Sequence, residues 1–334
     1  MGLGVHNFHD SQNAVVPSCI FNNRPSFWGL IYPFIEQNAL YEILGSKHDS
    51  TVATRKAPLL GNSTTNTGQW FVRTLVEEER KAFGSVTIYK CPTRRSGEKY
   101  IAAAPEGSSN DNGFGPRGDY AIVSSQNSNG VSTGITAQWL QQVSLYGGDD
   151  VHISGRNSSP FRVSTVTWND GTSHGSDKNG CRYLASWKPR DTFAWWQDGL
   201  SNQLIVGEKF IPQELIDYPV STYLDSFMHL QWDGGYLNPQ SDYFNANIAR
   251  IIDESQACIK RSPNDIAGPE AWGKSVNDNP PNIDYREAVF GGIHPGVGQF
   301  LIGDGSVSSI SVSVSQNILA ALAKVNDGAT ASLP

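Results

Sequence analysis

Near its C-terminus the chain carries two β-type runs on either side of an Asp304-Gly305 pair. The first run covers Val297 to Gly303, and the second covers Ser306 to Val312. Because an Asp-Gly pair accepts the positive φ angles of a two-residue type I′ turn, the pattern predicts an antiparallel hairpin.

Side-chain alternation along the first run indicates which residues face which side of that sheet. A period of two places Phe300 and Ile302 on one face and Gln299 and Leu301 on the other. A short amphipathic helix over Ser315 to Val325 is predicted to follow the hairpin.

The first quarter of the chain has helical rather than β-type spacing. Met1 to Asp10 is typical of the last turns of a helix, and Ser26 to Leu44 is crowded with apolar residues at helical intervals. Pro33 lies inside that second segment and is expected to kink it or to mark its true start. Gln69 to Phe83 predicts a third helix, with Glu77 to Lys81 on its solvated side.

From Val86 onward the spacing changes to short β-type runs between turn-forming clusters. Helices followed by many strands predict an α+β fold, with the N-terminal helix packed on an antiparallel sheet and large β and loop insertions in the middle. The predicted strands are Val86 to Lys90, Tyr120 to Ser124, Phe161 to Trp168, Gln203 to Glu208, Phe227 to Trp232 and Arg286 to Phe290.

Composition excludes several classes of protein. The net charge is −7, with no long run of one sign, and a nucleic-acid groove would need a basic stripe. No stretch of 18 or more apolar residues is present, so no segment is long enough to span a bilayer as a helix. The start, from Met1 to His6, lacks the basic and apolar regions of a signal peptide. Either the protein is cytosolic or a targeting segment has been removed.

Motif searches give no catalytic centre and no resident metal. There is no Gly-x-Ser-x-Gly, no His-Glu-x-x-His and no phosphate-binding glycine loop. His6 and His9 have helical spacing that could bind a metal, but without an apparent third ligand a packing role is expected. No cofactor is predicted. Calcium in the loops at Gly147 to Asp150 or Asp170 to Gly180 is a secondary alternative to ordinary solvated turns.

Four cysteines are spread widely, at Cys19, Cys91, Cys181 and Cys258. Their separation excludes the paired spacing of a zinc finger. Buried free thiols, or one or two disulfides in an oxidising compartment, are both compatible with this pattern.

Four segments in order resemble one family of bacterial proteins. The first is His6-Asn7-Phe8-His9-Asp10 together with the Trp28 to Tyr41 block, and the second is Lys90-Cys91-Pro92. The third is Asp198-Gly199-Leu200-Ser201-Asn202 with Gly207-Glu208, and the fourth is His294 followed by nine residues and then Asp304-Gly305. Together they resemble a planctomycete-expanded family of unknown function with an N-terminal prepilin-type cleavage and methylation segment and a closing H-x9-D-G domain. That N-terminal segment is absent from this sequence.

The resemblance implies a pilin- or pseudopilin-like protein with a single elaborated domain over residues 1–334. Its helical part would be residues 1–85, its β-rich inserted part 86–285, and its C-terminal hairpin and helix 286–334. Residues Met1 to Asp10 are expected to be helical and to lie at the edge of the molecule, with the N-terminus pointing away from the sheet. An apolar helix upstream would carry membrane attachment and polymerisation, so this chain itself is expected to associate weakly.

The function implied is that of a non-enzymatic structural subunit, exported to the cell surface, the periplasm or the extracellular space. It would assemble with itself or with other pilin-like or secretion components, without contacting nucleic acid. The contact surface is predicted to be aromatic, with Trp187, Trp195, Trp196 and Trp232 as binding residues. The alternative is an extracytoplasmic solute-binding protein whose tryptophans would line a cleft and stack on carbohydrate.

The motif residues are predicted to be structural. His294 is expected to fix the corner before the hairpin, and Asp304 to cap its own turn. Asp198, Gly199 and Glu208 are assigned to the same structural set. The exported setting also implies at least one disulfide, with Cys91 as its first candidate member.

Overall fold

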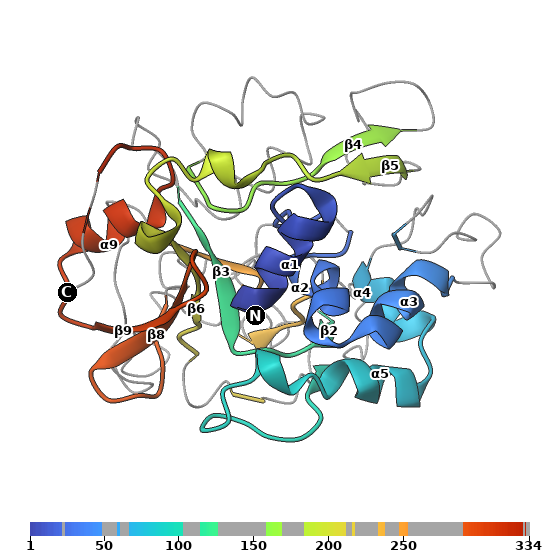
Figure 1. The fold of residues 1–334 in the computed structure, drawn as a ribbon. Helices are drawn as coiled ribbons and strands as arrows, with labels where there is room; N and C mark the ends of the chain where they lie inside the picture. Colours follow the sequence, from blue (N-terminus) through green and yellow to red (C-terminus); the bar gives the residue numbers. More distant parts are fainter. Residues whose placement is uncertain are drawn as a thin grey trace, which may run out of the picture.

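The computed structural model describes residues 1–21, 24–48, 59–60, 67–102, 114–125, 158–168, 184–211, 216–217, 233–237, 247–252, 290–329 and 331. Within these ranges the fold is α+β, as predicted: the N-terminal helices gather at one side, and the sheet with the C-terminal hairpin and the C-terminal helix lies at the other (Figure 1). None of the described helices has the length and apolar character needed to cross a membrane. The predicted strand Phe227 to Trp232 and both proposed calcium loops lie outside the described residues.

The central sheet has five strands in the order β7-β3-β6-β8-β9. All neighbouring pairs are antiparallel except β3 and β7, which run parallel. Two further two-stranded sheets pair β1 with β2 and β4 with β5. The strands are β1 (Tyr100–Ile101), β2 (Gly115–Pro116), β3 (Tyr120–Ser124), β4 (Thr165–Trp168), β5 (Leu184–Lys188), β6 (Leu204–Glu208), β7 (Ala249–Ile251), β8 (Val297–Ile302) and β9 (Val307–Ser311).

Helices and 3-10 turns flank this sheet. The C-terminal helix starts after Ser315, whose hydroxyl accepts the amide of Ile318 as an N-cap, so the predicted helix is confirmed. The elements are α1 (Gly2–Gln12), α2 (Phe27–Leu30), η1 (Tyr32–Ile35), α3 (Asn38–Ser46), α4 (Thr67–Arg73), α5 (Glu77–Gly84), η2 (Thr87–Tyr89), η3 (Phe193–Trp195), η4 (Leu200–Asn202) and α9 (Gln316–Ala323).

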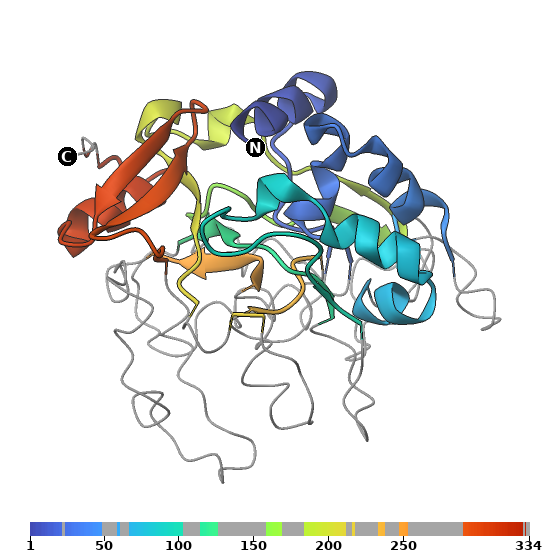
Figure 2. The ribbon, with the colours of Figure 1, turned by 90° about the horizontal axis from the view of Figure 1, so that it is seen from below.

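Two apolar cores lie on opposite faces of the sheet. Phe300 and Ile302 pack in the smaller core with Leu319 of α9, whereas Leu301 belongs to the larger core. The alternation predicted for β8 is therefore confirmed. The larger core also holds Val5 of α1, so α1 and α9 are on different sides of the sheet. Figure 2 shows the N-terminal helices and the C-terminal hairpin as separate flanks of the molecule.

The hairpin is confirmed, but its turn differs from the prediction. Leu301 pairs with Val307, and Ile302 donates its amide to the carbonyl of Ser306, so Gly303, Asp304 and Gly305 form a three-residue connection. Only Gly305 has a positive φ, +90°. Asp304 instead accepts hydrogen bonds from the amide and hydroxyl of Ser306, so the predicted capping role is confirmed. This capping lets the turn form without positive φ at Asp304.

Gly305→Val is expected to lower the free energy of unfolding by about 1 kcal/mol or more, because a β-branched residue resists positive φ. Urea unfolding followed by circular dichroism would measure the loss. Val307→Thr, in the adjoining strand, serves as the control, since its side chain is exposed and it keeps a β-branched residue. An equal loss for both variants would contradict the assignment of strain to Gly305.

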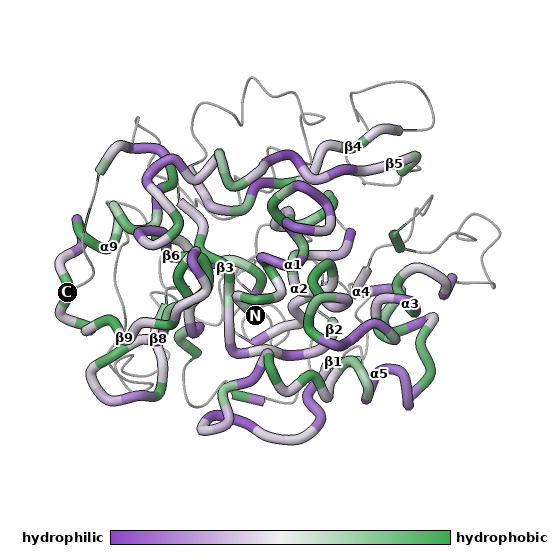
Figure 3. Tube along the Cα trace, in the orientation of Figure 1, coloured by the Kyte–Doolittle hydropathy of each residue, from purple (hydrophilic) through white to green (hydrophobic). Residues whose placement is uncertain are grey.

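Three local predictions need correction. Ser26 to Leu44 is broken into α2, η1 and α3, with Pro33 in the first turn of η1, so the expected break occurs at the proline. Gln69 to Phe83 forms parts of two helices, α4 and α5, rather than one helix. The charged run lies on α5, which carries a purple stretch in Figure 3. Val86 to Lys90 contains η2 rather than a strand, and there the buried Tyr89 donates its hydroxyl to the carbonyl of Trp28.

The N-terminal helix is confirmed and lies at the surface, in agreement between the two ribbon views (Figures 1 and 2). Its start, however, does not point away from the sheet. Gly2 lies against the β8–β9 turn so closely that an added Cβ would come within 2.9 Å of Gly305 Cα. Val5 and Phe8 are buried, while Leu3 is 73% exposed. The buried stripe docks the helix on the domain, as its short apolar face requires.

Candidate functional site

A pocket of about 490 Å³ opens where the start of α1 meets the hairpin. Its walls come from segments that are far apart in the sequence. It is lined by Met1, Gly2, Leu3, Cys91, Pro92, Thr93, Tyr120, Val206, Glu208, His294, Gln299, Phe300, Leu301, Gly305 and Val307. A concave site with a few convergent polar groups is the usual form of a ligand-binding site.

Three chemically distinct side chains converge in this pocket. The Nε2 atom of His294 lies 3.3 Å from Oε1 of Glu208 and 3.9 Å from Sγ of Cys91. The ligand-type atoms of all three lie within 4.8 Å of one another. Cys91 and Glu208 are 2% exposed, whereas the His294 side chain is 33% exposed. The histidine therefore forms the solvent-facing side of the cluster.

Glu208 is positioned at the end of β6 by close backbone packing. An added Cβ at Gly207 would lie 2.6 Å from the ring of Phe300 and 2.7 Å from the ring of Phe290, so only glycine fits there. An added Cβ at Gly292 would lie against Oε2 of Glu208. The same oxygen accepts the amide of Gln299 at 3.4 Å. The two glycines and the β8 amide thus fix the carboxylate in the pocket wall.

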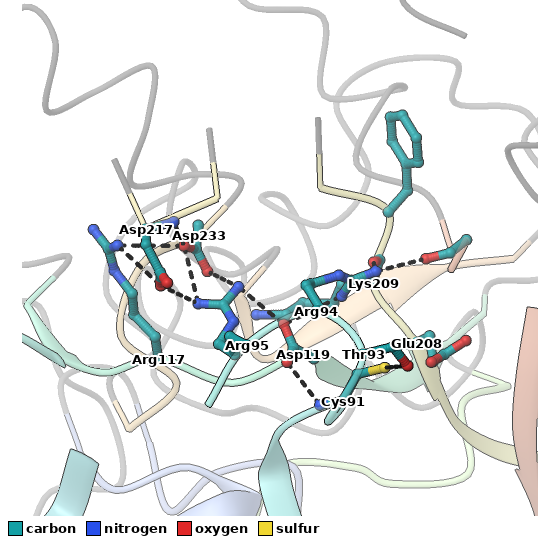
Figure 4. Close-up of polar contacts among 12 residues, drawn as sticks. Cys91, Thr93, Arg94, Arg95, Arg117, Asp119, Glu208, Lys209, Asp217 and Asp233 are labelled. Carbon is teal, nitrogen blue, oxygen red and sulfur yellow. Dashed lines mark hydrogen bonds and ion pairs between the residues drawn. The ribbon is translucent and has the colours of Figure 1, made fainter. Parts of the chain in front are cut away.

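Cys91 follows η2 and is held by a buried carboxylate. Its amide donates to Oδ2 of Asp119 at 2.7 Å, and its Sγ lies 3.4 Å from Oγ1 of Thr93 (Figure 4). Asp119 comes directly before β3, and its own amide donates to the carbonyl of Tyr89. The start of β3 therefore positions the cysteine.

Asp119 belongs to a buried network of charges behind the pocket (Figure 4). Arg94 and Arg95 approach Oδ1 of Asp119 at 3.2 and 2.9 Å. Arg95 also makes a two-pronged contact with Asp233, at 3.1 and 2.8 Å. Burial alone would raise the pKa of Asp233, but Arg95 and Arg117 outweigh it and hold that pKa below its usual value. The network is a rigid ionic support for the Cys91 loop.

Lys209, the residue after Glu208, is fully buried beside this network. Its Nζ donates to the carbonyl of Asn247 at 3.5 Å. The backbone carbonyl of Lys209 accepts a hydrogen bond from the Arg94 side chain at 2.9 Å. Burial lowers the pKa of Lys209 to about 7, against the attraction of Asp233. It therefore titrates near neutral pH in the folded protein.

The thiol and the carboxylate both approach the same ring nitrogen of His294, and this limits the chemistry of the site. In a catalytic triad the nucleophile contacts one ring nitrogen and the acid orients the other. Here Cys91 and Glu208 both approach Nε2 of His294. The arrangement is instead a convergent donor set, and Cys91, Glu208 and His294 are the described residues that could together hold a metal ion.

The prediction for His294 therefore needs correction. It does precede the hairpin, but its side chain faces an acid and a thiol in an open pocket rather than the loop backbone alone. Cys91 is a free thiol, so its predicted place in a disulfide is wrong. Cys19 is also free and buried in the apolar core, which raises its pKa to about 12. Cys181 and Cys258 lie outside the described residues.

The four tryptophans predicted to form a contact surface have different surroundings. Trp196 is 3% exposed and donates its indole N–H to the carbonyl of Pro160, so it is a core residue. Trp195 lies under the guanidinium of Arg162, 3.8 Å from its ring centroid. Trp187 is partly buried against the larger core, and Trp232 lies outside the described residues.

The remaining motif residues have structural surroundings. Asp198 accepts the amides of Asp327 and Gly328, both at 3.1 Å, and so ties the segment after α9 to η4. Gly199 has a φ of +94° where the chain turns into η4. His6 and His9 both pack against the ring of Phe193, at 5.1 and 4.0 Å between centroids. Both histidines therefore pack against an aromatic ring, as the sequence predicts.

The three clustered residues each come from a segment that carries the family resemblance: Cys91 from Lys90-Cys91-Pro92, Glu208 from Gly207-Glu208, and His294 from the C-terminal motif. No local spacing relates the three residues, so the sequence alone does not indicate that they lie together. The buried charge network was missed entirely.

The chain belongs to the family described as a protein of unknown function (DUF1559), whose model matches residues 1–317. No curated protein and no solved structure matches the chain.

Proposed function

We propose that this chain is an exported, non-enzymatic, pilin-like subunit that assembles with further copies of itself at the bacterial cell surface. The observation that carries the proposal is a pair of exposed apolar side chains at the mouth of the pocket. Leu3 is 73% exposed and Val307 is 68% exposed, and both line the same cavity. Exposed apolar side chains gathered at one place are typical of contact surfaces.

The edge of the sheet supports the same surface. Within the described part of the chain, β9 is the last strand of the central sheet, so one side of its backbone is not paired with another strand. An open edge of this kind accepts a strand from a second chain. Val307 begins β9, and Leu3 lies on the first turn of α1. The proposed contact therefore combines an apolar patch with a backbone edge.

Cross-linking in the producing cell tests this function. A photoreactive residue in place of Leu3 should give adducts that contain two copies of this chain, and Val307→Asp should reduce their yield at least several-fold. A photoreactive residue at Val76, which is 53% exposed but does not line the pocket, is the matched control. Adducts of equal yield from both positions, or none from Leu3, would contradict the proposal.

A second candidate function is extracytoplasmic ligand binding. The pocket itself favours it, since about 490 Å³ is sufficient for a small molecule and Cys91, Glu208 and His294 supply polar contacts. The short name of the matching family model, SBP_bac_10, agrees with this function. Such a ligand would be held by this cluster in the pocket.

A further inference from the structure

We propose that Cys91, Glu208 and His294 bind a divalent transition-metal ion of the zinc type, with a coordination position left open to the pocket. The thiolate, the carboxylate and the imidazole are all established zinc donors. A sulfur donor disfavours Mg²⁺ and Ca²⁺, which prefer sets of oxygen ligands. The inference goes beyond surface assembly and does not depend on it.

The distances between the donor atoms fit a tetrahedral ion. Zinc lies about 2.0–2.2 Å from nitrogen and oxygen ligands and about 2.3 Å from sulfur, so tetrahedral angles separate N from O by about 3.4 Å and N from S by about 3.6 Å. The observed separations are 3.3 Å between His294 Nε2 and Glu208 Oε1, and 3.9 Å between His294 Nε2 and Cys91 Sγ. The third pair, Cys91 Sγ and the Glu208 carboxylate, lies within 4.8 Å, against about 3.6 Å around a tetrahedral ion, so the thiol has to move toward the carboxylate when the ion binds.

The surroundings are those of a built site. Cys91 is anchored through its amide to Asp119, and Glu208 through Oε2 to the amide of Gln299, which leaves Oε1 directed at the histidine. Such contacts around the ligands orient them and restrict their motion. Gly292 leaves room for the carboxylate, because any Cβ there would overlap it.

The fourth position faces the cavity. All three donors line the pocket, and the exposed fraction of His294 gives the ion a route from solvent. Three protein ligands with one open position are typical of sites where zinc coordinates water or an exogenous group, whereas purely structural zinc has four protein ligands. The ligand that completes the sphere would therefore come from the pocket.

Titration of the chelator-treated protein with Co²⁺, as a spectroscopic substitute for zinc, tests the site. One equivalent should produce a thiolate-to-cobalt charge-transfer band and the visible bands of tetrahedral Co²⁺, and Zn²⁺ should displace both. Cys91→Ser should abolish the charge-transfer band. His294→Ala and Glu208→Gln should each weaken binding by at least about a hundredfold, since loss of even an outer contact costs about 10- to 100-fold.

Cys19→Ala is the matched control, because Cys19 is the other described free thiol and lies in the apolar core, away from the pocket. It should bind Co²⁺ as the unaltered protein does. Circular dichroism of each variant checks folding, and Glu208→Gln preserves the shape of its side chain if the other variants unfold. Mass spectrometry adds a second readout: Zn²⁺ should protect Cys91 from alkylation. Absence of the charge-transfer band in the unaltered protein, or its persistence in Cys91→Ser, would overturn the inference.

Discussion

Asp233→Asn should lower the free energy of unfolding by about 3 to 5 kcal/mol, the usual loss when one partner of a buried ion pair is removed. The Arg95 side chain is fully buried and uses two of its nitrogens to contact the carboxylate of Asp233. An asparagine keeps the shape but removes the charge, so the guanidinium remains in the interior with only part of its compensation. Urea unfolding would measure the difference.

Glu77→Gln is the control for this change, because it also converts a carboxylate to an amide. Glu77 pairs with Arg80 and Lys81, but its side chain is 48% exposed. Ion pairs at exposed positions contribute little to stability, so the control should lose much less than Asp233→Asn. Similar losses for the two variants would show that the interior network does not support the fold as described.

The stability of the protein should rise between pH 7 and pH 10 through Lys209, and Lys209→Met should remove this rise. In the folded state the pKa of Lys209 is lowered to about 7, whereas the unfolded chain titrates near its ordinary value. Between these two values the unfolded chain binds the additional proton, so unfolding becomes less favourable as the pH increases. Below about pH 7 both states are protonated and the cost of burying the charge is fully present.

The expected slope is about 1 kcal/mol per pH unit, since one unit of pKa corresponds to about 1.4 kcal/mol. Denaturant unfolding of both proteins at several pH values gives the difference directly, and groups that titrate in both proteins cancel from it. Lys81→Met, at a partly exposed position on α5, should follow the unaltered protein. If Lys209→Met shows the same pH dependence as the unaltered protein, Lys209 does not lose its proton in this range.

Local sequence signals predicted those parts of the fold in which neighbouring residues determine the outcome. The hairpin at Asp304-Gly305, the helix after Ser315 and the break at Pro33 all depend on residues within a few positions of one another. The turn type was wrong because Asp304 bonds to Ser306, which stabilises a three-residue connection. The strand predicted over Val86 to Lys90 is wrong because the tertiary contact of Tyr89 with Trp28 outweighs the β-type spacing.

The site could not be predicted because its parts are related only by the folded chain. The sequence predicts structural roles for Glu208 and for His294, since nothing in it indicates that β6 and the segment before β8 are adjacent. The buried charge network could not be predicted for the same reason. Arg95 and Asp233 are separated by 138 positions, and isolated charged residues are far more often exposed than paired in the interior.

The distance along the chain between Cys91 and His294 has a kinetic consequence. They are 203 positions apart, so their contact closes one of the longest loops in the molecule. Contacts at such separation form slowly, because the entropy of loop closure is lost before the contact contributes to stability. Part of the pocket wall beside Cys91 comes from β8, through Gln299, Phe300 and Leu301. Shielding of the thiol is therefore expected to be complete only after β8 has docked.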